Sequence, residues 1–226
     1  MTNHSLLCHR SDERLATLIA KNWLQKEDQV LSVLDIGCGD GVVQQNLPNN
    51  CRYIGLDLSD ACIYSQNKNN SNIRYVDPSE LVKLLHSLEK VDAVLLFDVL
   101  EHTAEFTALF EDALSLSNRY IAVSLPNELF LADRLRMLMG EEVGANSLDL
   151  VGMPIGFKHQ YIVNIAKARK LLVQKATEKG FHLKHEIFRP LQAKAPILQP
   201  LLWLMRKFSS TQLWSMGSVF IFEINS

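Results

Sequence analysis

The chain has 226 residues, of which 47% are hydrophobic and 21% charged, as in an ordinary globular protein with one substantial core. Its formal net charge of −2 gives no overall attraction to phosphates, so we do not expect nucleic acid as a partner. The four cysteines show no C-x-x-C spacing, which argues against a zinc knuckle or a disulfide framework. Neither a signal peptide nor an apolar run of membrane-spanning length is visible, which predicts a cytoplasmic protein.

The first half of the chain is predicted to alternate between helices and strands. An amphipathic helix is expected at 11–26, with Leu18, Ile19 and Trp23 on its apolar face. The alternation that follows predicts an α/β fold built on a doubly wound sheet. Its strands are expected at 30–36, 52–57, 73–76, 91–97 and 119–124, with helices near 42–46, 59–67, 79–88 and 104–114, the last capped by Thr103.

The second half departs from this simple alternation. A further helix is expected at 127–139. Asn164 is the predicted N-cap of a helix that ends at Gly180, and strands at 181–188 and 218–224 would complete a sheet of seven strands. We expect a single domain over 1–226, with insertions on the substrate side at 126–160 and 189–215.

The stretch directly after the first predicted strand is the most informative part of the sequence. It reads Asp35-Ile36-Gly37-Cys38-Gly39-Asp40-Gly41, with three glycines spaced two residues apart in a sharp turn. Glycine adopts positive φ without steric cost and lets the backbone pass close to a ligand. A nicotinamide-type fingerprint would need a glycine where Val42 stands, so this turn predicts a different ligand.

Acidic residues end the next two predicted strands. Asp57 follows Gly41 by 16 residues, as expected for one β–α–β step, and a carboxylate there is placed to accept both hydroxyls of a ribose. The alternative is that Asp57 caps the following helix, although Ser59 is available for that role. Asp77 precedes a proline, a pair that also commonly starts a turn.

The D-x-G-x-G-x-G order of residues 35–41 resembles motif I of the class I S-adenosylmethionine (SAM) methyltransferases. The string Asp98-Val99-Leu100-Glu101-His102 resembles the fourth-strand motif of small-molecule methyltransferases such as the ubiquinone-biosynthesis O-methyltransferases. The resemblance implies a Rossmann-like, doubly wound sheet of seven strands, the last antiparallel, with helices on both faces. It also implies SAM as cofactor and S-adenosylhomocysteine (SAH) as product.

The same resemblance assigns residues to the parts of SAM. Asp35 is expected to neutralise the ammonium group of the methionine part, directly or through water, while the glycine backbone packs on the ligand. Asp77 takes the place at which class I enzymes contact the adenine amine. The expected cofactor-binding residues are Asp35, Gly37, Cys38, Gly39, Gly41, Asp57, Leu58, Asp77, Phe97 and Asp98.

Three interpretations are open for His102 and its neighbour Glu101. In the favoured one both are catalytic together with His159, and His102 is the general base for a hydroxyl acceptor. In the second they only form a helix N-terminus, where the dipole favours a carboxylate. In the third, which is not favoured, they bind a divalent metal with Asp98 and His159, as the acidic residues and histidine do in related small-RNA 2′-O-methyltransferases. Adjacent residues would reach one ion only from an irregular turn.

We therefore expect an enzyme that methylates an oxygen of a small or lipid-linked metabolite. One alternative is an N-methyltransferase of a small molecule, which needs no base beyond a deprotonated amine. Another is a SAM-binding regulatory or assembly protein without turnover.

The segment 201–208 carries apolar residues on more than one face of a predicted helix. Leu204 and Phe208 share one face, and Trp203 lies on the opposite side. Such a helix is either buried between the sheet and a neighbouring helix, or it contacts an apolar partner outside the fold. Trp203, Arg206 and Lys207 together favour the second alternative, as a lid over a hydrophobic or lipid-linked acceptor, with a peripheral membrane contact through 196–208.

Overall fold

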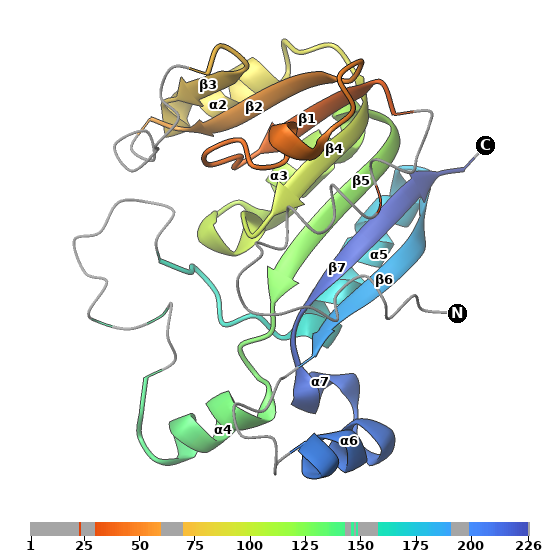
Figure 1. Cartoon of the computed structure of the whole chain (residues 1–226). Helices are drawn as coiled ribbons and strands as arrows, with labels where there is room; N and C mark the ends of the chain where they lie inside the picture. Colours follow the sequence, from red (N-terminus) through yellow and green to blue (C-terminus); the bar gives the residue numbers. More distant parts are fainter. Residues whose placement is uncertain are drawn as a thin grey trace.

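The computed structural model describes residues 23, 30–59, 70–142, 146, 148, 158–190 and 199–225. Within this part of the chain, seven strands form one sheet with the order β3-β2-β1-β4-β5-β7-β6 (Figure 1). The expected seven-stranded Rossmann-like sheet is therefore confirmed. The strands are β1 (Ser32–Ile36), β2 (Arg52–Leu58), β3 (Ile73–Val76), β4 (Val91–Phe97), β5 (Ser117–Pro126), β6 (Phe181–Pro190) and β7 (Ser215–Ile224).

The centre of the sheet is parallel, as its continuous apolar runs predict. β1 pairs with β2 on one side and β4 on the other, so Leu34 lies beside both Ile54 and Val94. The middle of each central strand is buried on both faces, which is why these strands show no alternation of polar and apolar residues. The carboxyl ends of β1, β2 and β4 consequently meet at one edge, where α/β proteins bind ligands.

The last strand, β7, is antiparallel to both of its neighbours. It lies between β5 and β6, with Val123 opposite Phe220 on one side and Ile187 opposite Val219 on the other. The expected antiparallel last strand is therefore confirmed. Because β7 forms hydrogen bonds with both β5 and β6, it joins these two strands into one sheet.

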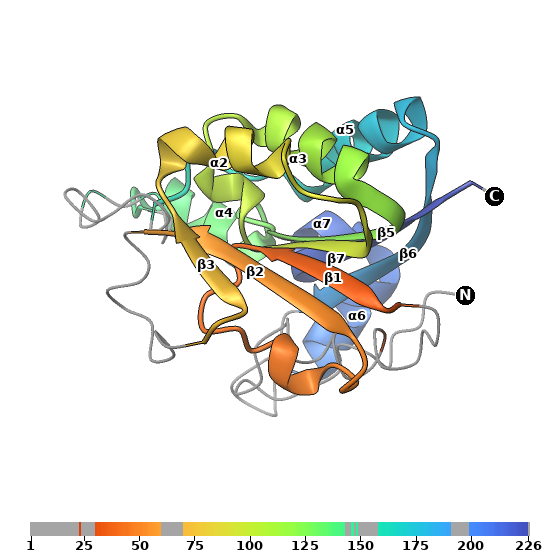
Figure 2. The ribbon, with the colours of Figure 1, turned by 90° about the horizontal axis from the view of Figure 1, so that it is seen from above.

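Helices α2 (Pro78–Leu85), α3 (Phe106–Leu116) and α5 (Ile165–Glu178) lie on one face of the sheet (Figure 2). Phe110 of α3 and Leu172 of α5 are fully buried there against the strands. On the other face Trp23 packs edge-on against Tyr120, with ring centroids 5.4 Å apart. The helices expected at 11–26 and 59–67 lie outside the described residues, apart from Trp23 and Ser59.

Several predicted helix boundaries are wrong for identifiable reasons. The expected helix at 42–46 is only a 3-10 turn, η3 (Gln44–Asn46). Thr103 does not cap α3, because its hydroxyl donates to the carbonyl of Leu100 and the helix starts three residues later. By contrast, Asn164 caps α5 as predicted, accepting hydrogen bonds from the first turn.

The expected helix at 127–139 begins only at Leu131, as α4 (Leu131–Leu138). The preceding Asn127 is held out of the helix because its side-chain amide donates to the carbonyls of Gln212 and Ser215. Those carbonyls belong to the end of the chain, and no local pattern around Asn127 reveals them.

Two more helices, α6 (Gln199–Phe208) and α7 (Thr211–Trp214), precede β7. Figure 1 shows them with α4 at the end of the molecule where β5 finishes. Trp203 and Phe208 of α6 are exposed, so the interpretation of this segment as a buried crossover helix is wrong. No helix in the described residues is long and apolar enough to cross a bilayer.

Candidate functional site

The turn after β1 needs its three glycines for their backbone conformation. Gly37, Gly39 and Gly41 have φ of 75°, 54° and 71°, a region that residues with a Cβ seldom occupy. The turn is tied back to β2, because the amides of Gly37 and Cys38 both donate to the carbonyl of Leu56. The predicted sharp turn at this position is therefore present.

The three glycines face different surroundings. A Cβ on Gly37 would lie 2.2 Å from Cγ2 of Val99, and a Cβ on Gly41 would lie 2.9 Å from Cδ1 of Ile73. Among the described residues, no atom lies within 4 Å of the position that a Cβ on Gly39 would take. Gly39 thus exposes bare backbone to an open space at the carboxyl edge of the sheet, which fits the close approach of a ligand such as SAM.

Asp57, at the end of β2, joins that strand to the glycine turn. Its Oδ2 accepts a hydrogen bond from the amide of Gly39 at 2.5 Å, and its Oδ1 accepts one from the amide of Leu58 at 2.7 Å. Burial raises the pKa of the Asp57 carboxyl, while these two amides oppose that rise. The side chain remains partly exposed, so its expected contact with a ribose stays open to test.

Asp35 lies buried beneath the turn and is paired with a tyrosine. The hydroxyl of Tyr53 donates to Oδ2 of Asp35 at 2.8 Å. Burial raises the pKa of Asp35 to about 7, and the tyrosine hydrogen bond partly offsets this effect. A nearby cation would stabilise the ionised form of this carboxyl, which is consistent with the predicted pairing to the SAM ammonium group.

The remaining predicted cofactor residues occupy different settings. Cys38 is buried, and its thiol stays protonated because burial raises its pKa. Asp77 is the N-cap of α2, with Oδ1 accepting from the amide and hydroxyl of Ser79. The turn interpretation of Asp77 is therefore confirmed, while its contact with adenine stays a prediction, as do those of Leu58 and Phe97.

Asp98 follows β4 in a conformation that is rare for its residue type. Its φ is 54°, the single positive value among the described non-glycine residues. The hydroxyl of Ser124 stabilises it twice, by accepting from the amide of Asp98 at 2.9 Å and donating to its Oδ1 at 2.7 Å. The carboxylate is thereby held in an exposed position at the carboxyl edge of the sheet.

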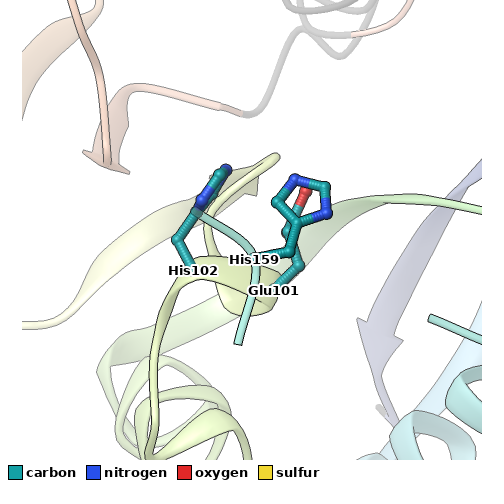
Figure 3. A group of neighbouring side chains, drawn as sticks. All are labelled: Glu101, His102 and His159. Carbon is teal, nitrogen blue, oxygen red and sulfur yellow. The ribbon is translucent and has the colours of Figure 1, made fainter. Parts of the chain in front are cut away.

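Glu101, His102 and His159 come together (Figure 3). The first two lie three and four residues beyond Asp98 in the chain, and His159 returns from a distant segment. One ligating atom from each of the three lies within 4.8 Å of the others. Glu101 and His102 belong to a 3-10 turn, η5 (Leu100–His102), which is the irregular geometry that lets adjacent side chains converge. The rings of His102 and His159 meet edge to face, with centroids 4.6 Å apart.

Hydrogen bonds orient both imidazole rings. Nδ1 of His102 lies 3.2 Å from the carbonyl of Lys158, which fixes Nδ1 as the protonated nitrogen. Nδ1 of His159 lies 2.8 Å from Oε1 of Glu128. Since both Nδ1 atoms are engaged, Nε2 of each ring remains for a proton, an acceptor or a metal ion.

Glu128 is a site residue that the sequence analysis missed. It is buried, and its Oε2 accepts a hydrogen bond from the amide of Val163 at 2.9 Å while Oε1 contacts His159. Its position four residues after the fifth predicted strand was a usable signal, because strand ends line the ligand edge. Its histidine partner, 31 residues further along the chain, was not apparent.

The surroundings of Glu101 disfavour the charged form of its carboxyl group. Burial raises the pKa of its carboxyl to about 8, and the charges of Asp98 and Glu128 add to that rise. Its Oε2 is buried, and none of the described residues offers it a hydrogen-bond partner. A proton or a cation would relieve this arrangement, so the three side chains fit a divalent metal as well as a proton-transfer site.

Comparisons with known proteins agree with this architecture. Residues 7–150 match the family model described as "Methyltransferase domain". Magnesium protoporphyrin IX methyltransferase (ChlM) from Synechocystis PCC 6803, with bound SAH, is 16% identical with a TM-score of 0.56, covering 98% of this chain and 92% of that one. No curated protein sequence matches the chain.

Two further solved structures share the fold at 16% identity. The plantazolicin methyltransferase BamL, in complex with a triazolic desmethylPZN analog and SAH, has a TM-score of 0.56 and covers 94% of this chain and 84% of that one. The small RNA methyltransferase HEN1 has a TM-score of 0.58 and covers 93% of this chain but 25% of that one. The likeness is therefore one of fold.

The glycine turn predicts different outcomes for two matched substitutions. Gly37→Ala should destabilise the fold by roughly 1–3 kcal/mol, because the new Cβ overlaps Val99 and the backbone is left-handed. Gly39→Ala meets no protein atom, so it should lose about 1 kcal/mol from its φ alone and mainly weaken SAM binding. Denaturant unfolding and calorimetric titration separate the two. Wild-type affinity in Gly39→Ala would contradict this assignment.

Asp57→Ala should weaken SAM binding while leaving the fold intact. Loss of a charge-assisted hydrogen bond removes roughly 1.5–3 kcal/mol, or about 10- to 100-fold in dissociation constant. Glu178→Ala is the matched control, because Glu178 is an exposed carboxylate at the end of α5 that pairs with Lys175 away from the glycine turn. Calorimetric titration showing unchanged affinity for Asp57→Ala would remove Asp57 from the binding site.

Proposed function

Since this chain belongs to the class I SAM-dependent methyltransferases, we propose that it methylates a hydroxyl oxygen of a small or lipid-linked metabolite, with His102 as the base. Bound SAM supplies an electrophilic methyl group on a sulfonium. The observation that carries the proposal is the orientation of His102, whose Nδ1 faces the carbonyl of Lys158 and whose Nε2 is therefore the basic nitrogen.

The electrostatics of His102 support a role in proton transfer. Burial, followed by the nearby His159, lowers the pKa of His102 below its usual value of 6.5. The ring is consequently neutral near pH 7 and ready to accept a proton. The carboxylates of Asp98 and Glu128 act in the opposite direction, so they would stabilise the imidazolium once it forms.

The reaction needs the acceptor hydroxyl to face both Nε2 of His102 and the methyl group. The hydroxyl proton passes to Nε2 as an oxygen lone pair forms the new C–O bond. Positioning contributes much of the rate, and the hydrogen bond that Nδ1 of His159 donates to Glu128 fixes the orientation of the second ring. An amine acceptor would need no such base, which is why we favour oxygen.

The substrates of two similar structures support a small-molecule acceptor. One acts on magnesium protoporphyrin IX and another on plantazolicin. HEN1 is named for small RNA, but this chain covers only 25% of it. The net charge of −2 also favours an acceptor other than nucleic acid.

A metal-assisted form of the same reaction is the second candidate, favoured by the unpartnered Oε2 of Glu101. Glu101, His102 and His159 would hold the ion, and their carboxylate-plus-imidazole set suits a first-row transition ion better than magnesium. A bound ion would polarise the acceptor oxygen and lower the pKa of its hydroxyl. In this form His102 is a ligand rather than the base.

His102→Ala should lower the turnover rate by about 10²- to 10⁴-fold with little change in SAM affinity. His86→Ala is the matched control, because His86 is exposed and pairs with Asp112 away from the site. In the wild type, the rate should fall as the pH drops through the lowered pKa of His102, and the variant should lose this dependence. An unchanged rate and pH profile in His102→Ala would refute the base assignment.

Chelation separates the two candidates. If a metal is used, a chelator should abolish methyl transfer, manganese should restore it better than magnesium, and Glu101→Gln should prevent the recovery. If His102 is the base, the chelated protein should keep its full rate. Formation of SAH with a metabolite extract gives the readout in both cases.

A further inference from the structure

Helices α4 and α6 expose large apolar side chains instead of burying them. Leu138 is 83% exposed on α4, and Trp203 and Phe208 are 60% and 75% exposed on α6. Isolated exposed apolar residues are common, but these recur along two helices. We call them the α4–α6 surface, whose members are Leu135, Leu138, Met139, Leu201, Trp203, Leu204 and Phe208.

This surface lies at one end of the molecule. Helices α4 and α6 both pack against the short helix α7, and Figure 1 shows all three beyond the carboxyl end of β5. The same end of the sheet carries the glycine turn and the His102 cluster. The α4–α6 surface therefore belongs to the half of the molecule that contains the functional site.

The charges next to the surface are positive, although the whole chain has a net charge of −2. Helix α6 contains Arg206 and Lys207 and no acidic residue. On α4, Arg134 and Arg136 are exposed, and Arg136 pairs with the acidic residue of that helix, Asp133, at 3.1 Å. Two glutamates follow α4, so the excess of positive charge is concentrated on α6.

Lys207 combines with the aromatic rings of α6. Its Nζ lies 5.2 Å from the ring centroid of Trp203 and 5.8 Å from that of Phe208. An ammonium group that rests on exposed aromatic rings is suited to a boundary between apolar and polar phases, where tryptophan and lysine are enriched. Helix α6 thus places a basic side chain next to exposed aromatic side chains.

We propose that the α4–α6 surface binds an anionic lipid bilayer. The apolar side chains would enter the headgroup boundary, and Lys207 would face the lipid phosphates. A second copy of the chain suits this surface less well, because a two-fold contact would bring the basic side chains of both copies, Lys207, Arg134 and Arg136, into one interface. This proposal does not depend on the identity of the methyl acceptor.

Hydrogen bonds fasten the surface to the functional site. The buried side-chain amide of Asn127 donates hydrogen bonds to the carbonyl of Gln212 in α7 and to that of Ser215, the residue after this helix. The next residue, Glu128, holds His159 at 2.8 Å. Consecutive residues of one segment therefore fix the histidine cluster and α7, against which α4 and α6 pack, so a docked protein would present its site in a defined orientation to the bilayer.

Vesicle flotation tests the proposal with the full chain. The wild type should float with phosphatidylcholine vesicles that contain phosphatidylglycerol, and much less with phosphatidylcholine alone, with binding reduced by added salt. The double variant Trp203→Ala/Phe208→Ala should lower the partition coefficient by about tenfold or more. Lys207→Glu should lower it by about fivefold per unit of charge.

Val82→Ala is the matched control, because Val82 is 54% exposed on α2, away from the α4–α6 surface. It should float like the wild type, and calorimetric titration with SAM should show that every variant is folded. Absence of wild-type flotation, or equal flotation of the double variant, would overturn the proposal. So would a dimer by light scattering that the double variant converts to monomer, because the surface would then bind a second copy.

Discussion

The contact between Gly37 and Val99 holds the two halves of the site together. The first half is the glycine turn after β1, and the second is the turn that carries Asp98 and His102 after β4. A side chain at Gly37 would stand 2.2 Å from Val99, so the turns approach this closely only with glycine there. Both turns also contain left-handed backbone, which costs the glycines little, so the conformational strain lies at Asp98, where β4 ends.

Local sequence signals sufficed for the frame of the molecule. β3 and β4 have the predicted bounds because short apolar runs between polar turns leave one way to bury them. The glycine turn was equally accessible, since three glycines at this spacing have few structural uses other than backbone with positive φ. The cap at Asn164 also depends only on amides two and three residues away.

The features that were missed depend on contacts between distant parts of the chain. Asn127 resembles the start of a helix, yet its amide reaches Ser215, 88 residues further along. Glu128 could be placed at a strand end, but its role requires His159 to return beside it. The adjacent residues Glu101 and His102 can converge only in an irregular turn. The 3-10 turn that permits this has three residues, and so short a turn has no distinct sequence pattern.

The place of β7 in the sheet has a consequence for how the chain is assembled. Residues 215–224 are inserted between β5 and β6, so β5 has only β4 as a neighbour, and β6 lacks its partner β7, until this late segment has been synthesised. A nascent chain that ends near residue 190 would therefore carry β5 as an open edge, with apolar residues such as Ile121 and Val123 unable to complete their ladder. During translation this edge is the position most prone to pairing with another unfinished chain, which makes timely release of residues 215–224 a condition for soluble product.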